Sequence, residues 1–187
     1  MSEEPQYRVA MCRMTLKRIR NLPEADAVLS RVDPQDIEAI DGGRSLTWMD
    51  SRPLERLSAA LLDVLGPEGF KEFFAQQVTV WSESKLFGPI MASARRIFGK
   101  DPAGQFKWIA RGWQVTTRNM GSVTTESHEN TIRIYYANLP PRLRVERTLY
   151  SVEGSLLGMV RAQPEDATVE IDASRLEDGR ITCTIRW

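Results

Sequence analysis

One histidine and two cysteines are the side chains of this sequence best suited to ligate a metal or act as nucleophiles. Cys12 and Cys183 lie at opposite ends of the chain, and His128 is the single histidine. A zinc site needs several convergent ligands, so this set predicts none. A Ser-His-Asp triad would have to use His128, but no Gly-x-Ser-x-Gly turn supplies its serine. The cysteine spacing favours two reduced, packed thiols over a disulfide framework.

The glycines and carboxylates also lack the arrangement of a familiar catalytic site. The run from Gly154 to Gly158 has neither the lysine nor the preceding strand of a phosphate-binding loop. Carboxylates are plentiful, but they fall at expected helix caps, turns and solvent-facing positions. The prominent ones are Asp33, Asp36, Asp41, Glu126, Glu129 and Glu153. An enzyme that uses paired carboxylates at a cleft between helices and sheet stays open as an alternative.

Large aromatic residues gather around the expected transition from helices to sheet. Layered domains often leave an apolar, ligand-binding cleft at such a place, and ordinary core packing is the other explanation of these rings. We predict a pocket for a small apolar ligand, with no catalytic residue, no metal and no cofactor. The predicted lining residues are Trp81, Phe87, Trp108, Trp113, Tyr136 and Tyr150.

Composition and charge exclude several classes of function. The chain has 187 residues, of which 42% are hydrophobic, and its 25 basic and 25 acidic residues give a net charge of zero. No overall field draws it to nucleic acid, and its arginines are scattered among acidic residues. We find neither a signal sequence nor an apolar stretch of membrane-spanning length. These features predict a single cytoplasmic domain, residues 1–187, with no nucleic-acid partner and no transmembrane segment.

The elements that must position these residues form two blocks. Helical periodicity dominates residues 7–113, beginning with a helix over 7–20. Gly66-Pro67 should end one leucine-rich helix and start the next. Two further helices are expected, from about Glu83 to Phe98 and from Asp101 onward.

Residues 120–187 change to an alternating pattern. Two hairpins are expected, with turns at Glu129-Asn130 and Asp178-Gly179, and a helix over 144–161 between them. Gly154 and Gly158 would let another backbone or a ligand approach that helix closely. The predicted fold class is therefore α+β: an N-terminal helical block packed on a C-terminal four-stranded antiparallel sheet, in the order strand-strand-helix-strand-strand.

Several loose motifs resemble a set of paralogous myxobacterial proteins of undetermined function. They include residues 28–36, the segment from Trp48 to Pro53, Val152-Glu153-Gly154 and the closing Ile185-Arg186-Trp187. Those proteins in turn resemble the group with the haem-nitric-oxide-binding-like fold, which includes 4-vinyl-reductase-like ligand domains. The resemblance implies helices on a four-stranded sheet, frequent dimers and a ligand held between the layers.

Haem does not follow from that resemblance. Haem sensors of the group use a histidine on a helix and a Tyr-Ser-Arg motif, whereas His128 is expected at a hairpin tip and Val152 follows Tyr150-Ser151. We therefore expect a non-catalytic bacterial signalling domain that senses a small molecule or lipid, binds a protein partner, or does both. A homodimer is the expected assembly. The alternatives are the carboxylate enzyme and an interaction scaffold without a pocket.

Overall fold

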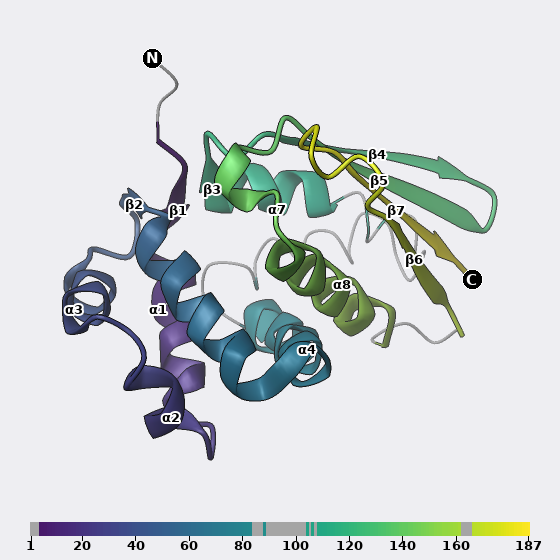
Figure 1. Ribbon diagram of the computed structural model, residues 1–187. Helices are drawn as coiled ribbons and strands as arrows, with labels where there is room; N and C mark the ends of the chain where they lie inside the picture. Colours follow the sequence, from purple (N-terminus) through teal and green to yellow (C-terminus); the bar gives the residue numbers. More distant parts are fainter. Residues whose placement is uncertain (1–3, 84–87, 89–103, 105, 107, 162–165) are drawn as a thin grey trace. The chain divides into compact units, whose positions relative to one another are not determined.

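The computed structural model describes residues 4–83, 88, 104, 106, 108–161 and 166–187 (Figure 1). The chain divides into two compact units, one of residues 1–70 and 116–119 and the other of residues 71–115 and 120–187. The helices expected from about Glu83 to Phe98 and from Asp101 fall mostly outside the described residues. That the two units together make one domain stays a prediction.

The first unit combines helices with a small sheet that we did not predict. Three short strands, β1 (Gln6–Arg8), β2 (Trp48–Asp50) and β3 (Thr117–Arg118), pair in the antiparallel order β2-β1-β3. Helix α1 (Val9–Ile19) therefore begins two residues later than the predicted start at Tyr7. Two or three residues are too few to show an alternating pattern, so only pairing between distant segments creates these strands.

Among the other helices of the first unit, α3 begins as its capping residue predicts. Helix α2 is short (Ala25–Leu29), and α3 runs over Pro34–Gly42. The Asp33 side chain accepts a hydrogen bond of 2.9 Å from the Gln35 amide, with Pro34 as the first helical residue. Helix α4 (Arg52–Glu83) continues into the second unit, and Gly66 bends it at a φ of 68°. The break predicted at Gly66-Pro67 is therefore present as a kink.

The second unit contains the predicted strand-strand-helix-strand-strand order. Its elements are α7 (Trp108–Thr116), β4 (Ser122–His128), β5 (Thr131–Ala137), the short helix η1 (Pro141–Leu143), α8 (Glu146–Arg161), β6 (Thr168–Asp172) and β7 (Ile181–Arg186). All pairings in the sheet are antiparallel, in the order β4-β5-β7-β6. The α+β class and the four-stranded antiparallel sheet are confirmed.

The core of the second unit lies between the sheet and α8. Alternate residues of β5 and β7 face inward, with Ile134 opposite Cys183 in the register. From α8, Val152, Leu156 and Val160 meet them. Trp187 packs against this core and stacks on Phe106, with ring centroids 6.4 Å apart. The alternating pattern of the two hairpins thus buries one face of the sheet, as period two requires.

Candidate functional site

Two of the predicted pocket residues, Trp113 and Tyr136, are in direct contact. Trp113 lies on α7 and Tyr136 on β5, and their rings meet edge to face with centroids 5.4 Å apart. Tyr136 is buried and belongs to the core cluster, against which Trp113 is partly buried. Burial, and secondarily the neighbouring Cys183, raises the pKa of the Tyr136 phenol well above its ordinary value. The phenol is therefore a neutral group, unsuited to act as a base.

Tyr150 lies elsewhere in the second unit, where α8 crosses α4. The Lys71 ammonium stands 5.4 Å from the centroid of its ring and 3.1 Å from a carboxylate oxygen of Glu153. The Tyr150 hydroxyl reaches Glu146 at 3.5 Å. A cation over a ring and beside a carboxylate holds the two helices in register, which is a structural role.

The α4–α8 crossing explains the two helical glycines. A Cβ on Gly154 would stand 2.3 Å from the Lys71 carbonyl oxygen, and one on Gly158 would stand 2.1 Å from that of Ala75. No side chain fits in such gaps, so the predicted close approach of another backbone is confirmed and α4 is that backbone (Figure 1). Helix α8 thus contacts the sheet on one side and α4 on the other.

The remaining predicted pocket residues are described only in part. Trp81 is half-buried on α4. Trp108 is the first residue of α7, and nothing is described of its side chain. Phe87 lies outside the described residues. Together with the separate places of Trp113 and Tyr150, this leaves the six-residue pocket a prediction.

A glutamine that sequence reasoning overlooked is the most unusual polar group of the second unit. Gln77, on α4, is fully buried at 0% exposure. Within the described part of the chain, neither its amide nitrogen nor its amide oxygen has a hydrogen-bond partner. Its sequence neighbours at helical spacing are aromatic: Phe70, Phe73, Phe74 and Trp81. The sequence does contain a signal for this residue, because Gln77 is a polar residue at helical spacing from aromatic ones.

The two cysteines are buried thiols of low reactivity. Both are free and fully buried. Burial raises the pKa of the Cys12 thiol to about 12. Burial also raises that of Cys183 to about 12, with a smaller contribution from the charge of Glu153. A thiol with so high a pKa carries almost no thiolate at neutral pH, so neither is a nucleophile or metal ligand.

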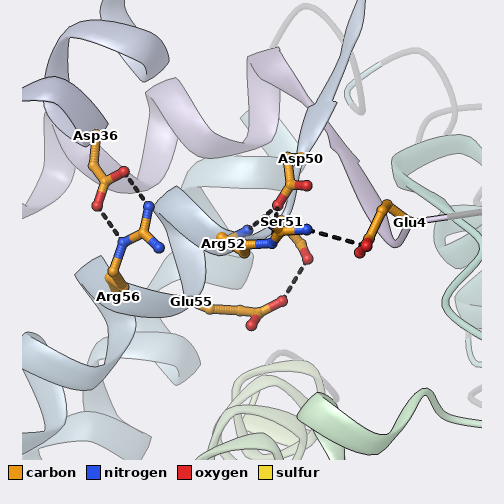
Figure 2. Close-up of polar contacts among 7 residues, drawn as sticks. All are labelled: Glu4, Asp36, Asp50, Ser51, Arg52, Glu55 and Arg56. Carbon is orange, nitrogen blue, oxygen red and sulfur yellow. Dashed lines mark hydrogen bonds and ion pairs between the residues drawn. The ribbon is translucent and has the colours of Figure 1, made fainter.

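Carboxylates at the start of α4 are tied into ion pairs and hydrogen bonds, as Figure 2 shows. Asp36, only 5% exposed, accepts two hydrogen bonds of 2.5 Å from Arg56. Arg52 reaches Glu4 at 3.1 Å and Asp50 at 3.4 Å. The buried Ser51 hydroxyl donates to Glu55. These carboxylates hold the first turn of the helix in place and are not available for acid–base chemistry.

Side chains that ligate metals are not gathered anywhere in the described residues. No group of three or more His, Cys, Asp or Glu side chains with metal-site geometry occurs there. His128 is exposed at the end of β4, opposite Thr131 across the hairpin. Among the described helices, none is both long and apolar enough to cross a bilayer.

Comparison with known proteins identifies the fold. No protein-family model matches the chain, and no curated protein matches it. Solved structures of H-NOX domains do match. A mutant H-NOX protein from K. algicida is 11% identical with a TM-score of 0.65, over 96% of this chain and 95% of that one. An H-NOX protein from T. tengcongensis is 16% identical with a TM-score of 0.62, over 96% of each chain.

A third match is an oxygen-binding H-NOX domain related to soluble guanylate cyclases, in its oxygen complex. It is 16% identical with a TM-score of 0.61, over 96% of this chain and 94% of that one. The chain therefore has the H-NOX fold, as the resemblance to the haem-nitric-oxide-binding-like group implied. The narrower resemblance to myxobacterial paralogues stays a prediction.

Two of the matching structures are described as haem proteins, but this chain has no histidine on a helix, because its single histidine lies on β4. Proteins hold haem iron through His, Cys thiolate, Met or Tyr. The single histidine is exposed on a hairpin, and the two cysteines are buried neutral thiols. Val152, which follows Tyr150-Ser151 in the sequence, packs into the core against the sheet. The histidine and the two cysteines are therefore unsuited to hold haem iron, and Val152 offers no charge to a haem propionate.

Proposed function

We propose that this chain is a non-catalytic signalling domain that senses a small molecule or lipid other than haem. One combination of observations carries the proposal: the chain has the H-NOX fold, while its only histidine lies exposed at the end of β4. The neighbours of known structure include an oxygen-binding domain, which supports ligand sensing as the use of the fold. The missing axial ligand supports a ligand of different chemistry.

The proposal extends to the setting of the protein. We propose a bacterial, cytoplasmic domain that works as a homodimer or with a signalling partner, and that takes a small apolar ligand against Trp113, Tyr136 and the other predicted aromatics. The carboxylate enzyme is less well supported. Asp36 accepts a hydrogen bond from Arg56, and Glu55 accepts one from Ser51. Glu153 forms an ion pair with Lys71.

Native mass spectrometry of the protein after incubation with a bacterial metabolite and lipid extract tests the proposal. We expect a bound species of discrete mass that survives gentle desolvation and dissociates on activation. Protein that emerges from the extract without any bound molecule, in repeated extracts of different polarity, contradicts a sensor and favours the scaffold without a pocket.

Absorption spectroscopy tests the exclusion of haem. After reconstitution with haemin and gel filtration, we expect no Soret band, because the single histidine lies exposed on a hairpin. A stable band that disappears in His128→Ala would show that the exposed histidine does ligate haem, and the ligand would then have to be reconsidered.

A further inference from the structure

The contrast between two adjacent glutamines of α4 points to a specific ligand contact. Gln76 is exposed, and its amide nitrogen donates to Glu72 at 2.9 Å. Gln77 is 0% exposed, and both its amide atoms lack a partner in the described part of the chain. Buried polar groups in folded proteins are nearly always paired, so an unpaired carboxamide needs an explanation.

The helix crossing does not supply the missing partner. Lys71 and Ala75 mark the side of α4 that meets α8. At about 100° per residue, Gln77 points roughly 120° or more away from both. The side chains one turn before and after it, Phe73 and Trp81, are aromatic rings. Gln77 is thus the polar residue of an aromatic helix face, turned away from the Lys71–Glu153 ion pair.

A water beside Gln77 would find few other polar partners on this face of α4. A buried water is held by two to four polar groups, roughly three on average. On this face of α4, Phe73 presents only ring surface next to Gln77, and the one polar atom of the Trp81 side chain is its buried indole nitrogen. Burying a carboxamide without a partner costs free energy that an apolar side chain of the same size would not cost. A ligand that pairs with the Gln77 carboxamide would offset this free-energy cost.

We propose that the Gln77 carboxamide is the recognition group of the ligand site, and that it binds a neutral, planar molecule with an adjacent hydrogen-bond donor and acceptor. Lactams, cyclic imides and primary carboxamides belong to this class. The inference rests on the sensor function proposed above and names the chemistry of its ligand.

The chemistry of the amide sets that class. A carboxamide offers N–H donors beside a carbonyl acceptor, so a partner with the same pair in reverse order forms two parallel hydrogen bonds. A carboxylate would leave the Gln77 carbonyl without a donor and would lose its own hydration in an apolar setting. The flanking rings of Phe73 and Trp81 suit a flat molecule, which they can contact by stacking or edge to face.

The test uses phthalimide, a planar imide with an N–H group, and N-methylphthalimide, which lacks that donor. Binding of each is measured by isothermal titration calorimetry to the full chain and to two variants. Gln77→Met removes the amide and keeps the length of the side chain. Gln76→Met makes the same change at the exposed neighbour. Chemical denaturation of each ligand-free variant is measured in parallel.

We expect the native chain and Gln76→Met to bind phthalimide about tenfold more tightly than N-methylphthalimide, the effect of roughly one hydrogen bond. Gln77→Met should lose this preference, and without ligand it should unfold at a higher denaturant concentration than the native chain. The inference is overturned if phthalimide does not bind, if Gln77→Met keeps the preference, or if Gln77→Met is the less stable protein.

The extract experiment separates this inference from the proposed function. A natural ligand that remains equally on the native chain and on Gln77→Met would overturn the role of Gln77 and leave the sensor function standing. Loss of that ligand in Gln77→Met alone would support both. If no extract molecule binds the native chain, the sensor function fails whatever the result with phthalimide.

Discussion

The two halves of helix α4 handle buried polar groups in opposite ways. Around its start, in the first unit, Ser51 just before the helix and Asp36 on the neighbouring α3 are buried, and each has a partner on α4 (Figure 2). In its second half, Gln77 is equally buried and has no partner in the described residues. There the helix is held by backbone contact with α8. The difference separates polar groups that maintain the fold from the one that we propose binds a ligand.

The largest effect should come from the glycine contact that holds the second half of α4. Gly158→Ala places a Cβ 2.1 Å from the Ala75 carbonyl oxygen, a backbone atom that cannot move aside cheaply. We expect a loss of about 3 kcal/mol in the free energy of unfolding, measured by urea denaturation, despite a gain in helix propensity of about 1 kcal/mol.

Gly42→Ala is the matched control, because a Cβ at this residue of α3 meets no described atom within 4 Å. It should leave stability unchanged or raise it slightly. Equal stability of Gly158→Ala and the native chain would mean that the two helices are not in close contact.

A smaller loss is expected at the start of α4. Asp36→Asn removes the charge that receives two hydrogen bonds from Arg56. Since the carboxylate is buried and the guanidinium is exposed, we expect a loss of about 2 kcal/mol, also by urea denaturation. Asp63→Asn, an exposed change on α4, the helix that carries Arg56, should stay within about 0.5 kcal/mol of the native value. If Asp36→Asn left the free energy of unfolding unchanged, the contrast between the partnered Asp36 and the unpartnered Gln77 would lose its basis.

The Ser51 hydroxyl should contribute less. Ser51→Ala takes away the donor that Glu55 accepts from, in a position without solvent exposure. Thermal and urea unfolding should both show a loss of about 1 kcal/mol. The corresponding change at an exposed hydroxyl, Ser30→Ala, is the reference and should cost about 0.5 kcal/mol or less. If Ser51→Ala were more stable than the native chain, as we expect of Gln77→Met, the buried polar groups near both ends of α4 would destabilise the fold alike.

The weakest contribution should come from an exposed ion pair of the first unit. Hydrogen bonds from Arg20, at 2.6 Å and 3.0 Å, lower the pKa of Asp41 in the folded chain. The stability they supply is therefore present above the unfolded-state pKa and is lost as the pH falls through the folded-state value. With side chains 43% and 44% exposed, water and salt screen the pair.

We expect Asp41→Asn to lower the free energy of unfolding by a few tenths of a kcal/mol at about pH 7, and by nothing measurable at about pH 2. Urea denaturation at the two pH values, with and without added salt, measures the difference. A larger loss of stability at about pH 2 than at about pH 7 would contradict the expected pH dependence.

The parts of the fold that were predicted are those encoded over short distances. Alternation and turn residues predicted β4, β5, β6 and β7, because period and turn chemistry both act within a few residues. The pairing of β1 with β2 and β3 was missed, since Gln6–Arg8 meets segments about forty and more than one hundred residues away. Asp33 as a cap of α3 was correctly inferred for the same local reason.

The pocket of six aromatic residues stays a prediction. Trp113 and Tyr136 are in contact, but Tyr150 lies at the α4–α8 crossing. The aromatic pattern marks residues that prefer burial and says nothing of which of them meet. Gln77 was overlooked although its helical spacing from Phe73 and Trp81 distinguishes it from Gln76.

The sequence by itself determined the α+β order of elements, the helix caps, the hairpin turns and the lack of a second histidine. These depend on residue types and on backbone preferences that act between near neighbours. Only the tertiary structure decided that Gly158 faces Ala75 and that Gln77 rather than Gln76 is withdrawn from water. Burial and pairing depend on which distant surfaces meet, and that is a property of the packed chain.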